Sequence, residues 1–268
     1  MGHVITGNTQ ARDGCLLFYR LHPNPGKRRL VLIHSLALDS GIWGDMHAEL
    51  GGDFEVLAYD CRGHGQSERR PGAYSVDLFA DDLVSLFNHC QWSSAIVAGC
   101  SMGGCVAQSF ASAYPERAEA LALIDTTAWY GPTATDDWTK RATKADEDGF
   151  ASMLPFQLSR WFGNGFLKSR VDRIEALSRV FLANDLACYQ SSCALLGSAD
   201  LRGEISALRL PVSVVVGEED YATPLAMSQE IQKRISGATL TVIPGARHLT
   251  PVQCPREISA LLRDLAAK

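Results

Sequence analysis

Residues 99–103 read Gly-Cys-Ser-Met-Gly and place a serine between two glycines. An apolar run at 95–98 precedes them, and apolar residues recur at helical spacing after them, which predicts strand, tight turn and helix. A serine at the apex of such a turn adopts a strained backbone conformation, and Gly99 and Gly103 remove side chains that would collide with the neighbouring backbone. The pattern predicts a nucleophile elbow that exposes the Ser101 hydroxyl above the edge of a sheet.

Two later loops supply the partners that a serine nucleophile needs. A base must remove the proton of the hydroxyl, and an acid must hold the tautomer of that base. Asp220 follows the apolar run at 212–217, and His248 follows the run at 239–243. Because the carboxyl ends of parallel strands meet at one edge of a sheet, we predict a catalytic triad of Ser101, Asp220 and His248.

Other residues compete for these roles. Asp125 also follows a predicted strand and is the rival for the acid. Glu218 and Glu219 are weaker rivals because Asp220 lies furthest into its loop. His64 lies between two glycines, and we interpret it as a structural residue whose imidazole bonds to loop carbonyls.

Two backbone amides are expected to stabilise a negatively charged oxygen. They are the amide of Met102, in the first helical turn after the elbow, and that of Leu36, in the loop at 34–37. Each donor contributes about 3 kcal/mol to transition-state stabilisation in comparable sites. The predicted reaction is attack by Ser101 on an ester or lactone carbonyl, formation of an acyl-enzyme, and hydrolysis by water that His248 activates. This chemistry needs no cofactor.

Strand and helix patterns alternate along most of the chain and predict an α/β fold. The expected architecture is a mostly parallel, doubly wound sheet. Strands are predicted at 15–21, 30–33, 54–59, 95–98, 119–125, 212–217 and 239–243, and helices at 74–88, after the elbow, at 223–235 and at 255–267.

From 127 to 208 the alternation stops, and only helical periodicities and loops are found. Large aromatic side chains enrich this segment, which starts just after a strand at the catalytic edge. We predict a core of residues 1–126 and 209–268 and a helical lid, or cap, of residues 127–208 over the serine.

Composition fits one catalytic domain with an insertion: 268 residues, 46% hydrophobic and 21% charged. The net charge of −5 and the absence of long basic runs argue against nucleic-acid and membrane-surface partners, and no apolar run has the length of a membrane span. The expected partner is a small-molecule ester or lactone. No oligomeric state is predicted.

Eight cysteines lie in or beside apolar segments without the spacings of a zinc site. The pairs Cys100 and Cys105, and Cys188 and Cys193, are interpreted as small buried hydrophobes. The N-terminal residues lack the pattern of a signal peptide, so we expect reduced thiols, a cytoplasmic protein and no metal.

Several stretches carry a family resemblance over nearly the whole chain. The serine, acid, histidine order and the general motifs resemble the α/β-hydrolases, and particular lid residues look like the β-ketoadipate (3-oxoadipate) enol-lactone hydrolases. The general motifs are His34-Ser35-Leu36, residues 59–67, residues 99–104 and Pro115-Glu116-Arg117; the particular ones are Trp138, Arg160-Trp161-Phe162, residues 189–193 and residues 199–202.

The resemblance implies an α/β-hydrolase fold and hydrolysis of a small lactone that bears a carboxylate. It implies that Arg160 binds this carboxylate, with a structural or solvated arginine as the alternative. Substrate-binding residues implied by the resemblance are His34, Ser35, Trp138, Arg160, Trp161 and Tyr189.

The chain departs from the family pattern near the expected site. His34 stands where Asn is frequent, Ala37 replaces a usual Gly, and Pro251-Val252-Gln253 replaces a more frequent Asn-x-Glu. Alternatives on the same scaffold are a carboxylesterase, a carbon-carbon bond hydrolase of ring-cleavage products, a lactamase, a cofactor-free perhydrolase, and a non-catalytic small-molecule receptor.

Overall fold

An eight-stranded sheet forms the centre of the protein in the computed structural model, which describes residues 4–268. The strand order is β1-β2-β4-β3-β5-β6-β7-β8; β1 and β2 run antiparallel to their neighbours and the other pairs are parallel. Every residue of β5 and β7 is buried, as expected for strands covered on both faces. The strands are β1 (Ile5–Gln10), β2 (Leu16–His22), β3 (Arg28–Ile33), β4 (Phe54–Tyr59), β5 (Ala95–Cys100), β6 (Ala118–Ile124), β7 (Val212–Gly217) and β8 (Thr239–Ile243).

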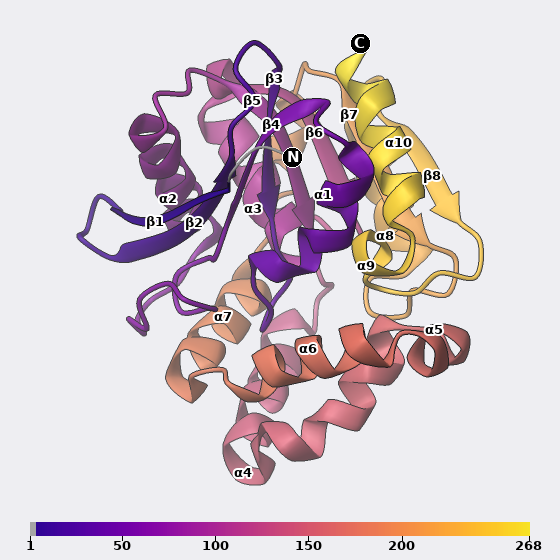
Figure 1. Cartoon of the computed structure of the whole chain (residues 1–268). Helices are drawn as coiled ribbons and strands as arrows, with labels where there is room; N and C mark the ends of the chain where they lie inside the picture. The colour runs from indigo at the N-terminus through magenta and orange to yellow at the C-terminus, as the bar shows by residue number, and fades with distance from the viewer. Residues whose placement is uncertain (1–3) are drawn as a thin grey trace.

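Helices cover both faces of the sheet (Figure 1). On one face α1 (Gly44–Leu50) lies against α10 (Pro255–Ala266), and on the other α2 (Val76–His89) lies against α3 (Met102–Ala113). Helix α8 (Leu225–Arg234) joins β7 to β8. Short helical turns complete the core at η1 (Ser40–Trp43), η2 (Pro115–Arg117), η3 (Glu204–Ala207) and α9 (Thr250–Gln253).

Four helices lie between β6 and β7 in sequence and beyond the carboxyl ends of the parallel strands in space (Figure 1). They are α4 (Ala134–Trp161), α5 (Asn164–Ser169), α6 (Val171–Leu182) and α7 (Leu186–Ser198). Helix α4 is kinked at Gly149, whose φ of 71° and ψ of 163° lie outside the helical region. The kink lets both halves of α4 face the core. The division at residues 127 and 208 stays a prediction.

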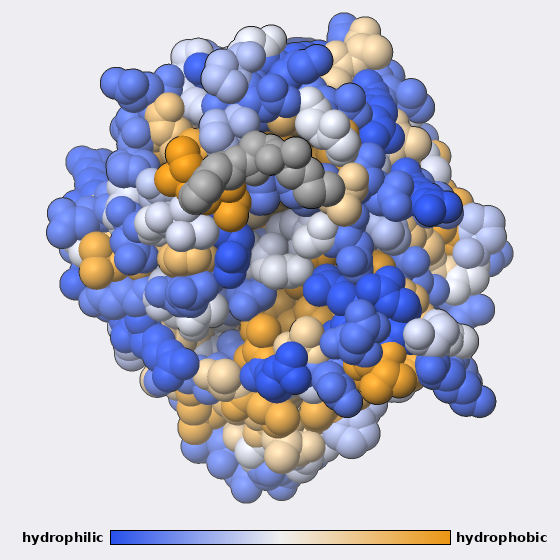
Figure 2. Space-filling model, in the orientation of Figure 1, coloured by the Kyte–Doolittle hydropathy of each residue, from blue (hydrophilic) through white to orange (hydrophobic). Residues whose placement is uncertain are grey.

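Hydrophobic residues gather on the surface of these four helices, below the core in the view of Figure 2. Val171 and Leu182 of α6 are among the exposed apolar side chains. In the part of the chain that the structure describes, no helix combines the length and hydropathy needed to cross a membrane.

The expected α/β-hydrolase architecture is confirmed, and the predicted strands and helices match within a few residues. Strand β1 and helix α1 had no sequence prediction, for physical reasons. The residues of β1 after Ile5 form no apolar pattern and are mostly exposed, and the strand forms by pairing with β2. Helix α1 has seven residues, too few to show a helical period.

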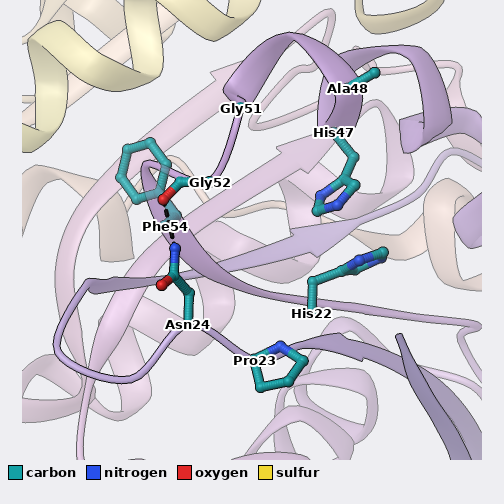
Figure 3. Close-up of a pocket in the computed structure, with 8 residues that line it drawn as sticks. All are labelled: His22, Pro23, Asn24, His47, Ala48, Gly51, Gly52 and Phe54. Atoms are coloured by element: carbon teal, nitrogen blue, oxygen red, sulfur yellow. Dashed lines mark hydrogen bonds between the residues drawn. The ribbon is translucent and has the colours of Figure 1, made fainter. Parts of the chain in front are cut away.

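Two neighbouring histidines line a pocket of about 330 Å³ at the amino ends of β3 and β4, the edge opposite the lid helices (Figure 3). The rings of His22 and His47 have their centroids 3.5 Å apart and are tilted by 35° to each other. Burial, followed by the neighbouring His47, lowers the pKa of His22 to about 4, and burial also lowers the pKa of His47. None of the predicted catalytic residues lines this pocket.

Acid is expected to destabilise the fold through its buried histidines. Burial, and then His34, lowers the pKa of the enclosed His64 to about 3, whereas a histidine in the unfolded chain titrates near 6.5. Below pH 6.5 the unfolded state therefore takes up a proton that the folded state does not, and stability falls as the pH falls. Between pH 7 and pH 5 this one residue should cost about 2 kcal/mol of the free energy of unfolding.

Urea unfolding of the native protein and of His64→Gln at both pH values measures this contribution. The glutamine keeps a donor for the Arg62 carbonyl that His64 contacts, but it does not titrate. The variant should show the smaller acid-induced loss, and an equal loss in both proteins would contradict the assignment.

Candidate active site

Ser101 occupies the sharp turn between β5 and α3. Its φ of 55° and ψ of −116° are a strained conformation for a residue with a side chain. A Cβ atom on Gly99 would overlap the Gly103 carbonyl, and one on Gly103 would overlap the Ile33 carbonyl. The two glycines are therefore required by close backbone approach, as the sequence pattern predicts.

A chain of hydrogen bonds joins Ser101, His248 and Asp220. The Ser101 Oγ lies 2.9 Å from the His248 Nε2, and the His248 Nδ1 lies 2.8 Å from the Asp220 Oδ2. All three residues are buried. With a proton on Nδ1, the ring donates to Asp220 and leaves Nε2 free to accept the serine proton. The structure thus brings the three predicted residues together in the order that proton transfer needs.

The carboxylate of Asp220 is held by its own loop. Its Oδ1 accepts hydrogen bonds from the Ala222 and Thr223 amides, and its Oδ2 accepts one from the Thr223 hydroxyl at 2.8 Å. Burial opposes ionisation, but His248 and these donors together lower the pKa of Asp220 below its ordinary value. The group is therefore a carboxylate at neutral pH, suited to stabilise an imidazolium.

The rival acid, Asp125, has other partners. Its carboxylate accepts hydrogen bonds from the Gly217 amide and from the amide and hydroxyl of Thr250. Burial, followed by the charge of Asp220, raises its pKa well above the ordinary value. Among the described residues, Asp220 is the acidic residue hydrogen-bonded to the His248 ring.

Glu218 and Glu219 also point elsewhere. Glu218 accepts a hydrogen bond from the Gly245 amide, and Glu219 pairs with Arg247 at 3.3 Å. Both are exposed, so neither has the enclosure of Asp220.

The two expected oxyanion donors lie at the same edge of the sheet. Leu36 lines the pocket with Ser101, and Met102 is the first residue of α3, where amides have no helical acceptor. Within residues 4–268 neither amide donates to a protein acceptor. Beside Leu36, Ala37 has a φ of 61°, the left-handed conformation that favours glycine. An alanine where the family usually has glycine therefore puts backbone strain next to the expected Leu36 donor.

The pocket at Ser101 is narrow and continues into an outer pocket. The free space beside the serine is about 30 Å³, room for a single water, whereas the outer pocket has about 260 Å³. A lactone must therefore displace some of the side chains that line both pockets. The inner pocket is lined by Ser35, Leu36, Ser101, Tyr130, Trp138, Arg141, Gln157, Arg160, Trp161, Ala222, Thr223 and His248, and the outer one shares Tyr130, Trp138, Arg141, Arg160 and Ala222 with it.

Two arginines from the two halves of α4 line both pockets. Arg160 lies over the Phe156 ring at 5.5 Å, and Arg141 lies over the Trp138 ring at 5.2 Å. Neither forms an ion pair with any described residue. Burial, followed by the charge of Arg141, lowers the pKa of Arg160. Two half-buried cations without an acidic ion-pair partner favour binding of an anion.

The loop of His248 holds the end of α4 in place. The amides of His248 and Leu249 donate to the carbonyls of Arg160 and Trp161 at 3.4 and 3.3 Å. The Arg247 guanidinium also bonds to a carbonyl of this segment, that of Phe162 at 3.1 Å. The His248 loop and the end of α4, which carries Arg160 and Trp161, are therefore joined through their backbones.

Of the six residues proposed for substrate binding, Ser35, Trp138, Arg160 and Trp161 line the pocket. His34 does not, because its Nδ1 donates to the Ser35 carbonyl and its Nε2 accepts from the Cys61 amide. Burial lowers the pKa of His34, which fits this neutral role in the loop.

Tyr189 does not line the pocket either. It is 1% exposed, and its hydroxyl accepts a hydrogen bond of 2.8 Å from the Arg141 Nε. Any contribution to binding therefore acts through Arg141. His64 donates from Nδ1 to the Arg62 carbonyl at 3.0 Å, in agreement with a structural interpretation.

Five lining residues had no role in the sequence analysis: Tyr130, Arg141, Gln157, Ala222 and Thr223. A signal for two of them was present, because Trp138 and Arg141, and Gln157 and Arg160, are each three residues apart and share helix faces. Gln157 is 1% exposed, and its Nε2 has no partner among the described residues. The side chain is therefore available to a substrate.

The eight cysteines are all free, and no group of three or more metal-ligating side chains is found within residues 4–268.

Comparison with known proteins identifies the family. Residues 30–261 match the profile of the alpha/beta hydrolase family. The chain belongs to the alpha/beta hydrolase family. A relative from Acinetobacter baylyi (strain ATCC 33305 / BD413 / ADP1), 3-oxoadipate enol-lactonase 2, is 31% identical over 93% of this chain and 92% of its own length.

Solved structures of other alpha/beta hydrolases are also similar. The enol-lactonase from Burkholderia xenovorans LB400 superposes with a TM-score of 0.92 and 28% identity, covering 98% of this chain and 100% of that chain. A malate-bound thermophilic esterase from Thermogutta terrifontis has a TM-score of 0.87 and 25% identity over 99% of this chain and 98% of that chain. With these relatives, this alpha/beta hydrolase is an enzyme of the carboxylic-ester hydrolase type.

Proposed function

We propose that this alpha/beta hydrolase opens a small carboxylated lactone, of the 3-oxoadipate enol-lactone kind, through Ser101, His248 and Asp220. The observation that carries the proposal is the hydrogen-bonded chain of these three residues beside two arginines that lack acidic partners. The enol-lactonase relatives supply the substrate class.

Acylation begins at the Ser101 hydroxyl. His248 takes the proton at Nε2 while Oγ attacks the lactone carbonyl, and Asp220 stabilises the resulting imidazolium. The amides of Met102 and Leu36 donate to the oxygen that becomes negative. When the intermediate collapses, the ring C–O bond breaks and His248 returns the proton to the ring oxygen. Because the leaving oxygen belongs to a comparatively stable enol, this step needs little acid catalysis.

Deacylation repeats the sequence with water as the nucleophile. His248 removes a proton from water, which attacks the ester bond to Ser101, and the same two amides stabilise the second intermediate. The acyl C–O bond to Ser101 then breaks, and the proton returns from His248 to the serine. The product has one carboxylate more than the lactone.

Arginine recognition supports a carboxylated rather than a neutral substrate. Arg160 lines both pockets, and Arg141 lies close enough to lower the pKa of Arg160. A guanidinium can bind a carboxylate with two parallel hydrogen bonds, and a second cation adds attraction in a site with little water. The malate-bound esterase among the similar structures also holds a carboxylate ligand.

A substrate panel tests the proposed class. Turnover of an enol-lactone derived from muconolactone is followed by its ultraviolet absorbance beside aryl acetates, a dienoate, a lactam and peroxide-dependent bromination. We expect kcat/KM to be highest for the enol-lactone. Turnover no faster than that of aryl acetates would refute the lactone assignment and leave a simple esterase, and a dominant dienoate activity would indicate carbon-carbon bond hydrolysis.

Replacement of Arg160 by methionine should act selectively on carboxylated substrates. We expect KM for the lactone to rise about tenfold or more, since a charge-assisted hydrogen bond contributes about 1.5–3 kcal/mol. Neutral esters should show nearly unchanged KM and kcat, because the catalytic triad is untouched.

Arg202→Met is the matched control. Like Arg160, Arg202 lies over an aromatic ring, that of Trp129, but it pairs with Asp200 outside the pocket. This variant should leave both substrate classes unaffected, and an equal effect of Arg160→Met on both classes would exclude carboxylate binding by Arg160.

A further inference from the structure

Asp125 is a fully buried carboxylate at the end of β6 that the proposed chemistry does not use. Its φ of 47° places it in the left-handed region, which aspartate tolerates better than most residues with side chains. Its amide donates to the Val215 carbonyl at 2.8 Å, which ties its backbone to β7. Both the backbone and the side chain of Asp125 are therefore fixed.

The carboxylate of Asp125 joins the two loops that carry the acid and the base. Its Oδ1 accepts from the Gly217 amide at 3.1 Å, three residues before Asp220. Its Oδ2 accepts from the Thr250 amide at 2.8 Å and the Thr250 hydroxyl at 2.7 Å, two residues after His248. The Asp125 side chain thus fixes the distance between Gly217, at the start of the Asp220 loop, and Thr250, at the end of the His248 loop.

We propose that Asp125 is a positioning residue that holds the Asp220 loop and the His248 loop in register, so that the His248 Nε2 reaches Ser101. This inference rests on the proposed function. It assigns to Asp125 a role different from that of the catalytic acid, and the effect passes through Gly217 and Thr250 rather than through contact with a substrate.

The hydrogen-bond pattern around Asp125 requires two acceptor oxygens. All three neighbouring groups donate, and a carboxylate accepts from all of them. An asparagine has one oxygen, so its NH₂ group must face either the Gly217 amide or the Thr250 amide. One of the two loops then loses its attachment, and small displacements of catalytic groups can lower rates about 100-fold.

The test compares Asp125→Asn with two other variants. Thr250→Val removes one of the three donors and leaves the amide of residue 250. Asp82→Asn is the control, because Asp82 is also a buried carboxylate and it pairs with Arg62 rather than with the Asp220 loop or the His248 loop. Each variant is assayed with an aryl acetate and with a fluorophosphonate that labels the active-site serine, at a temperature where circular dichroism shows it folded.

Asp125→Asn should lower kcat and the rate of labelling by about 10- to 100-fold, with KM changed less than threefold. Thr250→Val should lower both by a smaller factor. Asp82→Asn should lower the unfolding midpoint but label at the native rate, since a general loss of stability does not displace His248.

Labelling of Asp125→Asn at the native rate would overturn the inference. If that variant does not fold, Thr250→Val decides in the same way: slower labelling supports the positioning role and a native rate refutes it. Failure of the native protein to label at Ser101 would instead overturn the proposed function, and this inference with it.

Discussion

Replacement of Ser101 by alanine is expected to lower kcat/KM for every ester and lactone substrate by about 10⁵- to 10⁶-fold. The Ser101 Oγ lies 2.9 Å from the His248 Nε2. Alanine removes this proposed nucleophile and leaves the other side chains that line the pocket in place. The remaining rate would come from binding and from the oxyanion donors. Steady-state kinetics with an aryl acetate and with the enol-lactone measure the loss.

His248→Ala and the double variant complete this experiment. Because Ser101 and His248 act as one unit, each single variant should be about as inactive as the double variant. The free energy of unfolding of Ser101→Ala should change little, because the substitution removes one hydroxyl from a residue whose backbone conformation is set by the neighbouring glycines. A Ser101→Ala protein that keeps a tenth of the native activity would exclude serine catalysis.

Asp220→Asn is expected to lower kcat by about 10⁴-fold while KM changes little. The Oδ1 position accepts two amide hydrogen bonds, from Ala222 and Thr223, so an asparagine keeps its oxygen there. Its NH₂ group then faces the His248 Nδ1 and forces the proton of the ring onto Nε2. In this tautomer the imidazole cannot accept the proton of Ser101. The pH dependence of kcat measured beside the native enzyme reports the change.

Comparing Asp125→Asn with Asp220→Asn distinguishes the positioning role proposed for Asp125 from the catalytic role proposed for Asp220. It should cost far less than Asp220→Asn because Asp125 holds loops and does not contact the imidazole. A loss in Asp125→Asn equal to or greater than that in Asp220→Asn would show that the acid is assigned to the wrong residue.

The proximity of Ser101, Asp220 and His248 could be predicted because each of the three follows a strand whose apolar run is visible in the sequence. Strand ends converge through the sheet topology alone, so no lid packing is needed to bring Ser101, Asp220 and His248 together. The same reasoning places Leu36 and Met102 at the edge of the sheet.

The rest of the pocket depends on tertiary features that the sequence pattern does not show. Arg141 reaches the pocket because α4 bends at Gly149, and a glycine within a helical pattern does not indicate which way the helix turns. Tyr189 lies in the segment that resembles the enol-lactonase lid, yet the fold places it behind Arg141. The direction of a side chain on a lid helix depends on how the helices pack, and hydrophobic periodicity in the sequence does not predict that packing.

Labelling with a fluorophosphonate followed by peptide mass spectrometry tests the central claim most directly. We expect one adduct per chain, located on Ser101, which forms in the native protein and is absent from Ser101→Ala. The carboxylated lactone should protect Ser101 from labelling, and Arg160→Met should weaken this protection. Folded native protein that does not react, or an adduct on a residue other than Ser101, would contradict catalysis by Ser101.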